Sequence, residues 1–124
     1  MDDEVQRERE RARAALRDAQ VLLEEGGSDE GAINRLYYAA FHAAQAILYQ
    51  RGHAPEFHGH VRQLFGKHVV LPGDVPRSAG RLLSTLYDHR QRADYGVLDA
   101  DIDVSTLYHE TEQFVDRIGD LLEE

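Results

Sequence analysis

The chain has 124 residues, of which 42% are hydrophobic and 30% charged, with no Cys and three Pro. This length is typical of one domain, so we expect a single domain over residues 1–124. The lack of cysteine excludes disulfides, thiolate zinc sites and a cysteine nucleophile. The longest apolar runs fall far short of the ~20 residues that cross a bilayer, and residues 1–18 lack the apolar region of a signal peptide. We therefore expect a soluble, cytoplasmic protein that does not bind a membrane.

The net charge of −9 is distributed unevenly along the chain. Residues 1–34 carry five Arg and ten acidic residues, and residues 96–124 carry one Arg and nine acidic residues. Residues 35–95, by contrast, carry eight Lys or Arg, four acidic residues and six of the seven His. The overall negative charge disfavours tight binding of nucleic acid. Two interpretations remain open: the acidic ends are solvated helical faces, or the basic centre holds a site that faces an anion.

Helical periodicity dominates the N-terminal half of the sequence. From about Asp3 to Glu25, apolar residues recur at spacings of three, four and seven, which predicts the first helix. Gly26 and Gly27 are expected to end it, because glycine adopts the left-handed conformation at low cost. Ser28 is a good N-terminal cap for a second helix that runs to about Arg51. The alanines of this helix predict a close neighbour, and we expect it to be the central helix.

A narrow polar seam crosses the apolar surface of this second helix. Its members are Arg35, Tyr38, His42, Gln45 and Tyr49. Their alternating spacings of three and four place all five side chains on one side of the helix. The seam is either satisfied by another helix or a second subunit, or it is functional, with His42 as the residue suited to proton transfer.

The second half of the chain continues the helical pattern. We expect one short helix near Gly59–Phe65, followed by a turn marked by Pro and Gly, and a fourth helix from about Arg77 to Ala93. An acidic loop follows, and Ser105 is expected to cap the last helix. No alternation typical of a strand is present. The fold class is therefore all-α, an antiparallel up-and-down bundle of four to five helices.

Arg90 is the most informative single residue, because it continues the apolar stripe of the fourth helix. A guanidinium at such a position must be paired, reach out of the core or serve a function. Asp94 lies four residues later and Tyr95 follows it. One interpretation is a structural Arg90–Asp94 ion pair that closes the helix. The other is an arginine that binds an anion or phosphate, with a carboxylate and a hydroxyl beside it.

The histidines of the central block give little support to a metal site. The one spacing that resembles a pair of ligands is His58-Gly59-His60, and no HExxH motif accompanies it. The sequence also lacks the phosphate-binding and dinucleotide-binding glycine motifs and the GxSxG motif. We therefore expect neither a metal nor a cofactor.

Three segments together resemble the prokaryotic branch of the HEPN superfamily. The run from Asn34, NRLYYAAFHAAQAIL, resembles its SRAYYAxFHAAxALL helix. The stretch from His58, HGHVRQLFGKHVV, resembles its HxGVxxLFGxxFV segment, and the stretch from Leu86, LYDHRQRADY, resembles its LfelRqxADY segment. The order and spacing agree, and the resemblance covers nearly the whole chain.

The resemblance implies a helical homodimer that is often encoded beside a minimal nucleotidyltransferase and acts with it in a toxin–antitoxin-like pair. Active members of the superfamily are metal-independent RNases whose R-x(4–6)-H motif meets its symmetry mate at the dimer interface. In some pairs the nucleotidyltransferase adenylylates a tyrosine shortly after the motif's histidine. These properties are expectations that the resemblance brings to this chain.

Carried over to this sequence, the motif arginine is Arg90. The histidine position then holds Asp94 or Tyr95, and no histidine follows until His109. The chain thus departs from the RNase motif at its acid–base residue, which His42 or His89 would have to replace in space. Tyr95 is the tyrosine that corresponds to a modifiable hydroxyl.

Three functions follow from these observations. The first is a subunit that homodimerises and binds a nucleotidyltransferase or a nucleotide, through a basic face around Arg35, Arg90 and Arg92. The second is a metal-independent RNase with an altered acid–base set. The candidate catalytic residues are Arg90, Asp94 and Tyr95, and the candidate binding residues are Arg35, Tyr38, His42 and Arg92. The third is a structural helical dimer in which the Arg90–Asp94 pair stabilises the interface.

Overall fold

The computed structural model describes residues 2–124, apart from the side chain of His58. Within these residues it has five α-helices, one π-helical segment and no strand. The elements are α1 (Asp3–Glu24), α2 (Asp29–Gln50), α3 (His58–Phe65), η1 (Gly66–Val70), α4 (Arg77–Asp94) and α5 (Val104–Glu123). The expected all-α fold class is confirmed.

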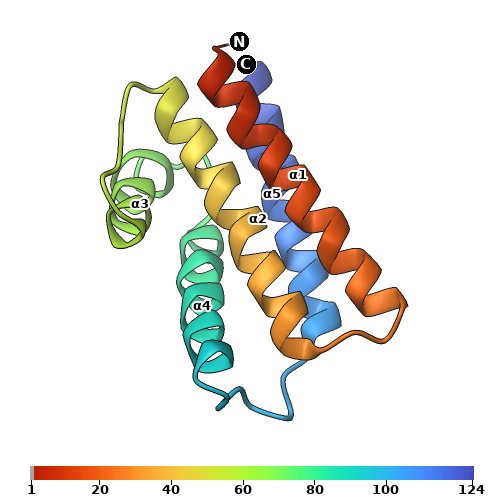
Figure 1. The fold of residues 1–124 in the computed structure, drawn as a ribbon. Coiled ribbons are helices and arrows are strands. Elements are labelled where there is room, and N and C mark those ends of the chain that lie inside the picture. The colour runs from red at the N-terminus through yellow and green to blue at the C-terminus, as the bar shows by residue number, and fades with distance from the viewer. Residues whose placement is uncertain (1) are drawn as a thin grey trace.

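The four long helices alternate in direction along the chain, as Figure 1 shows. Helix α2 lies among the others and packs against α1, α3, α4 and α5. The two chain ends meet at one end of the bundle, where Arg9 of α1 forms an ion pair with Glu123 of α5. The antiparallel up-and-down arrangement and the central position of α2 therefore agree with the sequence prediction.

Helix α2 is buried around most of its circumference. Twelve of its residues are buried, and half of these are alanines. Helix α1 presents three buried alanines, Ala12, Ala15 and Ala19, and it packs most extensively against α2. Small side chains allow the two backbones to approach closely, as the alanine content predicts.

The helix ends follow the predicted capping residues in most places. The Ser28 hydroxyl accepts a hydrogen bond of 3.0 Å from the backbone N–H of Gly31, and Gly26 adopts a φ of 71° after α1. The prediction that Ser105 caps the last helix is wrong. Helix α5 begins at Val104, and the Asp103 carboxylate accepts from the backbone N–H of Thr106 at 3.0 Å.

The segment after α3 also differs from the prediction. The helix near Gly59–Phe65 is present, but it continues directly into η1 instead of ending in a turn. The widened hydrogen-bond pattern of η1 is shown by Leu71, whose backbone N–H donates to the Gly66 carbonyl five residues earlier, at 2.9 Å. The turn follows only at Gly73, which has a φ of 92°. No helix in residues 2–124 is long and apolar enough to cross a membrane.

The close packing of α1 predicts a large effect of a larger side chain at Ala19, which is fully buried. We expect Ala19→Leu to lower the free energy of unfolding by about 1–3 kcal/mol, because overpacking forces neighbouring side chains out of their preferred rotamers. Arg17→Leu, at an exposed position of the same helix, should change it by less than about 0.5 kcal/mol. Urea denaturation measures both values, and equal midpoints for the two variants would contradict the packing.

Candidate functional site

Arg90 lies on α4 and reaches toward two tyrosines of α2. Its guanidinium carbon is 5.2 Å from the ring centroid of Tyr37 and 5.2 Å from that of Tyr38. Both distances fall within the range of cation–π attraction. Arg90, from the segment LYDHRQRADY, therefore packs on the two tyrosines of the segment NRLYYAAFHAAQAIL.

The predicted ion pair between Arg90 and Asp94 is present, but it is loose. The Arg90 Nε lies 3.6 Å from the Asp94 Oδ2, which is too long for a hydrogen bond. This Nε is buried and has no hydrogen-bond partner among the described residues. The Asp94 side chain is 52% exposed. Arg90 is therefore held by aromatic rings and retains unused donor capacity.

The contacts around Arg90 extend into a continuous arginine–tyrosine layer, made of Arg35, Tyr37, Tyr38, Arg62, Tyr87 and Arg90. At one end, the Arg62 guanidinium carbon lies 3.8 Å from the Tyr87 centroid, and Tyr87 meets Tyr37 edge to face at 5.9 Å. At the other end, Arg35 lies 5.3 Å from the Tyr38 centroid. Three guanidiniums from three helices are thus spaced by aromatic rings.

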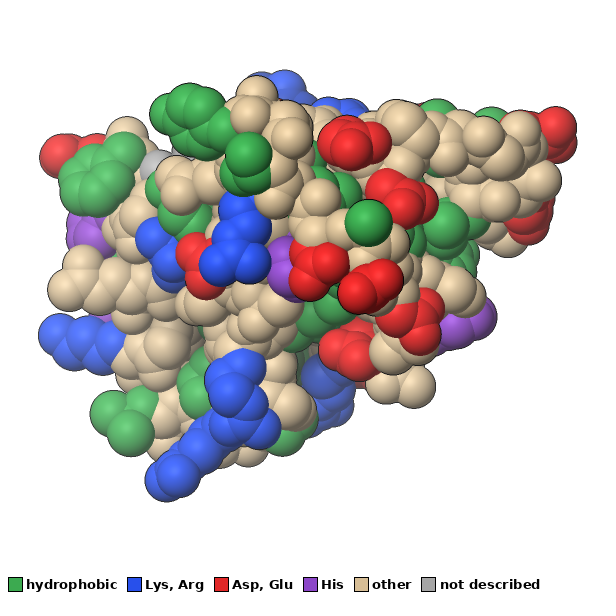
Figure 2. All heavy atoms as spheres, turned by 90° about the horizontal axis from the view of Figure 1, so that it is seen from below, with side chains coloured by type: hydrophobic (Ala, Val, Ile, Leu, Met, Phe, Trp, Pro, Cys, Tyr) green, Lys and Arg blue, Asp and Glu red, His purple; other side chains and the backbone are tan. Residues whose placement is uncertain are grey.

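The arginines of this layer have few contacts with acidic side chains. Arg35 donates two hydrogen bonds to the neutral side chain of Asn34, at 3.0 and 2.7 Å. No acidic side chain in residues 2–124 forms a hydrogen bond with Arg35, Arg62 or Arg90. Figure 2 shows the same polarity: Lys and Arg gather mainly on the side of α3 and α4, and most acidic side chains lie on the other side. Guanidiniums without acidic partners are suited to phosphate or carboxylate groups.

Tyr37, the buried tyrosine at the centre of the layer, does not exchange its proton at neutral pH. Tyr37 is fully buried. This burial raises the pKa of Tyr37 to about 12, although the nearby Arg90 charge acts in the opposite direction. The phenol therefore stays neutral, and its role is to position the Arg90 guanidinium.

The polar seam of α2 divides between two neighbours. Arg35 and Tyr38 belong to the arginine–tyrosine layer, whereas His42 binds α1. The His42 Nδ1 lies 2.6 Å from the Glu8 Oε2, and Arg11 donates to the other oxygen of Glu8 at 2.7 Å. The prediction that another helix satisfies the seam is confirmed for His42.

Glu8 is a residue that the sequence prediction missed. It is only 4% exposed. Its signal in the sequence is the series Val5, Glu8, Ala12 and Ala15, which places an acid on the buried stripe of α1 at spacings of three and four. Burial alone would raise the pKa of the Glu8 carboxyl, but the hydrogen bonds and charges of His42 and Arg11 lower it overall.

The remaining predicted residues lie at the C-terminal end of α4, outside the arginine–tyrosine layer. Tyr95 is 83% exposed, and Arg92 is also exposed. Both line a shallow hollow of ≈390 Å³ together with Asp88, Gln91 and Val97. The structure therefore brings Arg35, Tyr38 and Arg90 together and leaves Arg92, Asp94 and Tyr95 at the adjoining surface.

The histidines do not assemble into a metal centre in the described part of the chain. His53 stacks on His68 with ring centroids 3.9 Å apart, and His60 stacks on Phe57. The His58 side chain, which the sequence analysis considered as a ligand, lies outside the described residues. No three His, Asp or Glu side chains that the structure describes are grouped closely enough to hold a metal ion. His89 is half-buried, and its Nδ1 has no hydrogen-bond partner there.

The contact between Glu8 and His42 predicts a stability that depends on pH. We expect Glu8→Gln to lower the free energy of unfolding by about 1–3 kcal/mol at neutral pH, because it removes charge-assisted hydrogen bonds from a buried site. The pKa of Glu8 is lower in the folded state than its ordinary value of 4.5. The stabilisation is therefore complete above that ordinary value and is lost as the pH falls through the folded-state pKa.

Urea denaturation of the native chain and of Glu8→Gln between pH 3 and pH 7 measures this effect. The range spans the ordinary carboxyl pKa. The difference between the native chain and Glu8→Gln should narrow on the acid side. Glu4→Gln, at an exposed position of the same helix, serves as the control and should show a much smaller difference. A gap that stays constant across the range would refute the assignment.

Comparison with known proteins adds a family to this geometry. The sequence model of the HEPN domain family matches residues 5–121 of this chain. A "UPF0332 protein" of Thermotoga maritima is 33% identical over 118 residues, which cover 94% of this chain and 89% of that protein. A protein of Methanocaldococcus jannaschii with the name "Putative toxin MJ0605" is 33% identical over 123 residues, which cover 98% of this chain and 91% of that protein. The match spans nearly every helix described above, and the chain belongs to the HEPN family.

Proposed function

We propose that this protein is the HEPN subunit of a toxin–antitoxin-like pair and that it binds a minimal nucleotidyltransferase, or the nucleotide of that partner, through the arginine–tyrosine layer. The observation that carries the proposal is Arg90. Its guanidinium is placed against two tyrosine rings, while its buried Nε has no hydrogen-bond partner in residues 2–124. The Arg90 side chain is 23% exposed while its Nε is closed to solvent, so an incoming phosphate or carboxylate would meet the other nitrogens of the guanidinium.

The family context supports a role in such a pair. One of the relatives that aligns along 98% of this chain bears a name that describes it as a toxin, and a second M. jannaschii relative, 29% identical over 73 residues, bears a similar name. The three arginines of the layer, of which only Arg90 has an acidic partner in residues 2–124 and that at 3.6 Å, supply positive charge of the kind that binds a nucleotide phosphate.

A homodimer formed through the exposed surfaces of α2 and α4 fits the same geometry. The C-terminal end of α4 leaves Tyr95 and Val97 exposed, at 83% and 64%. Aromatic and apolar side chains of this kind are enriched in protein interfaces. A dimer across this surface would place two copies of Arg90 near each other, as the family resemblance implies.

RNA cleavage is the second candidate function. An arginine beside a phosphodiester stabilises the charge that develops in the transition state, and His89 carries a buried Nδ1 without a hydrogen-bond partner next to Arg90 in the chain. His42 is the weaker acid–base candidate, because its Nδ1 is engaged by Glu8. A structural dimer without a ligand is the third possibility, and the experiments below separate it from the other two.

Partner binding is tested by purifying the tagged protein from its native cells, where we expect a minimal nucleotidyltransferase to co-purify with it. We expect a stable complex that Arg90→Ala weakens about tenfold or more, because a hydrogen bond to a charged group contributes about 1.5–3 kcal/mol. Arg81→Ala, an exposed arginine of the same helix, should bind normally. Absence of a complex with the native protein would refute the proposal. Normal binding by Arg90→Ala would refute the arginine–tyrosine layer as the binding surface, whereas a native protein that forms no complex and an Arg90→Ala homodimer weakened in ultracentrifugation would support the structural dimer.

RNA cleavage is tested on purified protein in EDTA, with the native chain beside Arg90→Ala and His89→Ala. If the protein is an RNase, the native chain cleaves RNA, Arg90→Ala is inactive, and His89→Ala loses at least about 100-fold in rate, as removal of an acid–base group predicts. Our proposal of partner binding expects no cleavage by any of the three. Cleavage that persists unchanged in Arg90→Ala would indicate a contaminating nuclease.

A further inference from the structure

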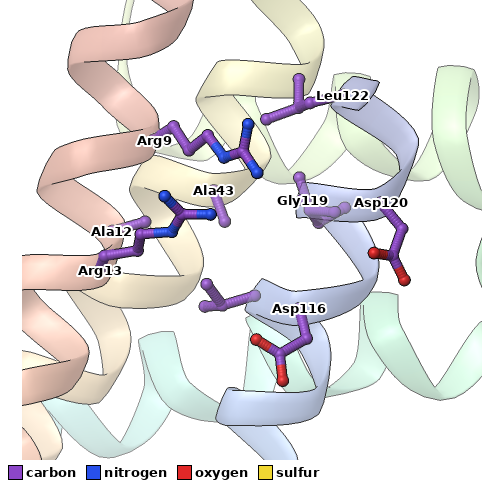
Figure 3. A pocket seen from close by; sticks show the side chains of 10 residues that line it. Arg9, Ala12, Arg13, Ala43, Asp116, Gly119, Asp120 and Leu122 are labelled. Carbon is purple, nitrogen blue, oxygen red and sulfur yellow. The ribbon is translucent and has the colours of Figure 1, made fainter. Parts of the chain in front are cut away.

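A second cavity lies far from the arginine–tyrosine layer, between α1 and α5. It has a volume of ≈330 Å³, which is at the lower end of the range for small-molecule sites. Its floor includes Ala12 of α1, Ala43 of α2 and Ile118 of α5. Figure 3 shows the side chains of Arg9 and Arg13 reaching from α1 toward α5 above this floor.

Small residues create this cavity. Alanines occupy the floor positions on α1 and α2, and Gly119 stands on α5 directly opposite the arginines. A Cβ added at Gly119 would lie 3.6 Å from the Arg9 Nη2, an ordinary contact distance. A longer side chain at this position would therefore project into the space that Figure 3 shows between the two helices.

The α1 side of the cavity holds two arginines, of which Arg9 also reaches an acidic partner at the end of α5. Arg9 is mostly buried, with 14% of its side chain exposed, and it pairs with Glu123 through Nη1. Its Nε is buried and has no hydrogen-bond partner in residues 2–124. The Arg9 Nη2 lies on the cavity side of the guanidinium, because a Cβ added at the cavity residue Gly119 would stand 3.6 Å from it. Arg13 forms no ion pair with any described residue.

The α5 side of the same cavity holds unpaired negative charge. Asp116 and Asp120 line the cavity one helical turn apart, and neither forms an ion pair within the described residues. The two arginines and the two aspartates therefore face one cavity without neutralising each other. A ligand with a single charge would meet repulsion from one of the two sides.

We propose that this cleft binds a small zwitterionic molecule with the chemistry of an amino acid, which carries a carboxylate at one end and an ammonium group at the other. The carboxylate accepts from the Arg9 Nη2 and from Arg13. The ammonium group donates to Asp116 and Asp120, and the carbon chain between them covers the apolar floor. This site is independent of the function proposed above, and no residue is shared between the two.

The proposal is tested by titrating the purified protein with 4-aminobutyrate and 6-aminohexanoate while recording the backbone amide NMR spectrum. We expect saturable shifts at amides of α1 and α5 around the cavity. Butyrate and butylamine, which carry one charged end each, should bind at least about tenfold more weakly, because each loses one ion pair in a partly buried site. No saturable shift with either zwitterion at tens of millimolar would overturn the proposal.

Two variants locate the binding. Gly119→Leu fills the cavity, and Arg13→Ala removes a guanidinium that contributes no ion pair to the described fold; both should abolish the saturable shifts. Arg81→Ala, on α4, is the matched control and should bind as the native protein does. If Gly119→Leu does not fold by circular dichroism, Arg13→Ala decides the outcome. Unchanged binding by a folded Arg13→Ala would overturn the assignment of the carboxylate position.

Discussion

The fold depends on the burial of α2 among the other helices. Because α1, α3, α4 and α5 all pack against it, each polar side chain on α2 must find a partner on a neighbouring helix or reach the surface. Toward α1, α2 packs against a helix whose buried residues are mostly alanines. Toward α4, the tyrosines Tyr37 and Tyr38 of α2 meet Arg90.

This constraint has different outcomes along the polar seam. Toward α1, His42 meets the buried carboxylate of Glu8, and Arg11 completes its hydrogen bonding. Toward α4, Tyr38 meets Arg90, which forms only a loose pair with Asp94. The first contact is saturated and acts as a structural link between two helices. The second leaves donor capacity unused, and this difference is why the proposed function rests on Arg90 and not on His42.

The same distinction applies to the cleft between α1 and α5. Arg9 is tied to Glu123 through one nitrogen, but its Nε has no partner within the described residues. Both candidate sites therefore use an arginine that is fixed by one contact and left incomplete at another atom. They differ in their surroundings: Arg90 has only a loose acidic partner, which favours an anion, whereas the aspartates on the α5 side of the cleft favour a ligand with both charges.

The sequence by itself determined the helices, their order and most of the core, because the apolar spacing of α1, α2, α4 and α5 is strongly periodic. It also singled out Arg90 and the polar seam. The predicted N-cap of α5 was wrong, because Asp103 and Ser105 are both suitable cap residues. The helix begins at Val104, so Asp103 is the residue that caps it. It did not predict η1, whose widened turn has no local signal.

The packing of the helices alone decided which residue of the polar seam meets which neighbouring helix. Partnerships such as that of His42 with Glu8, 34 residues away, depend on how the helices pack, and helical periodicity fixes the face of a side chain but not its neighbour.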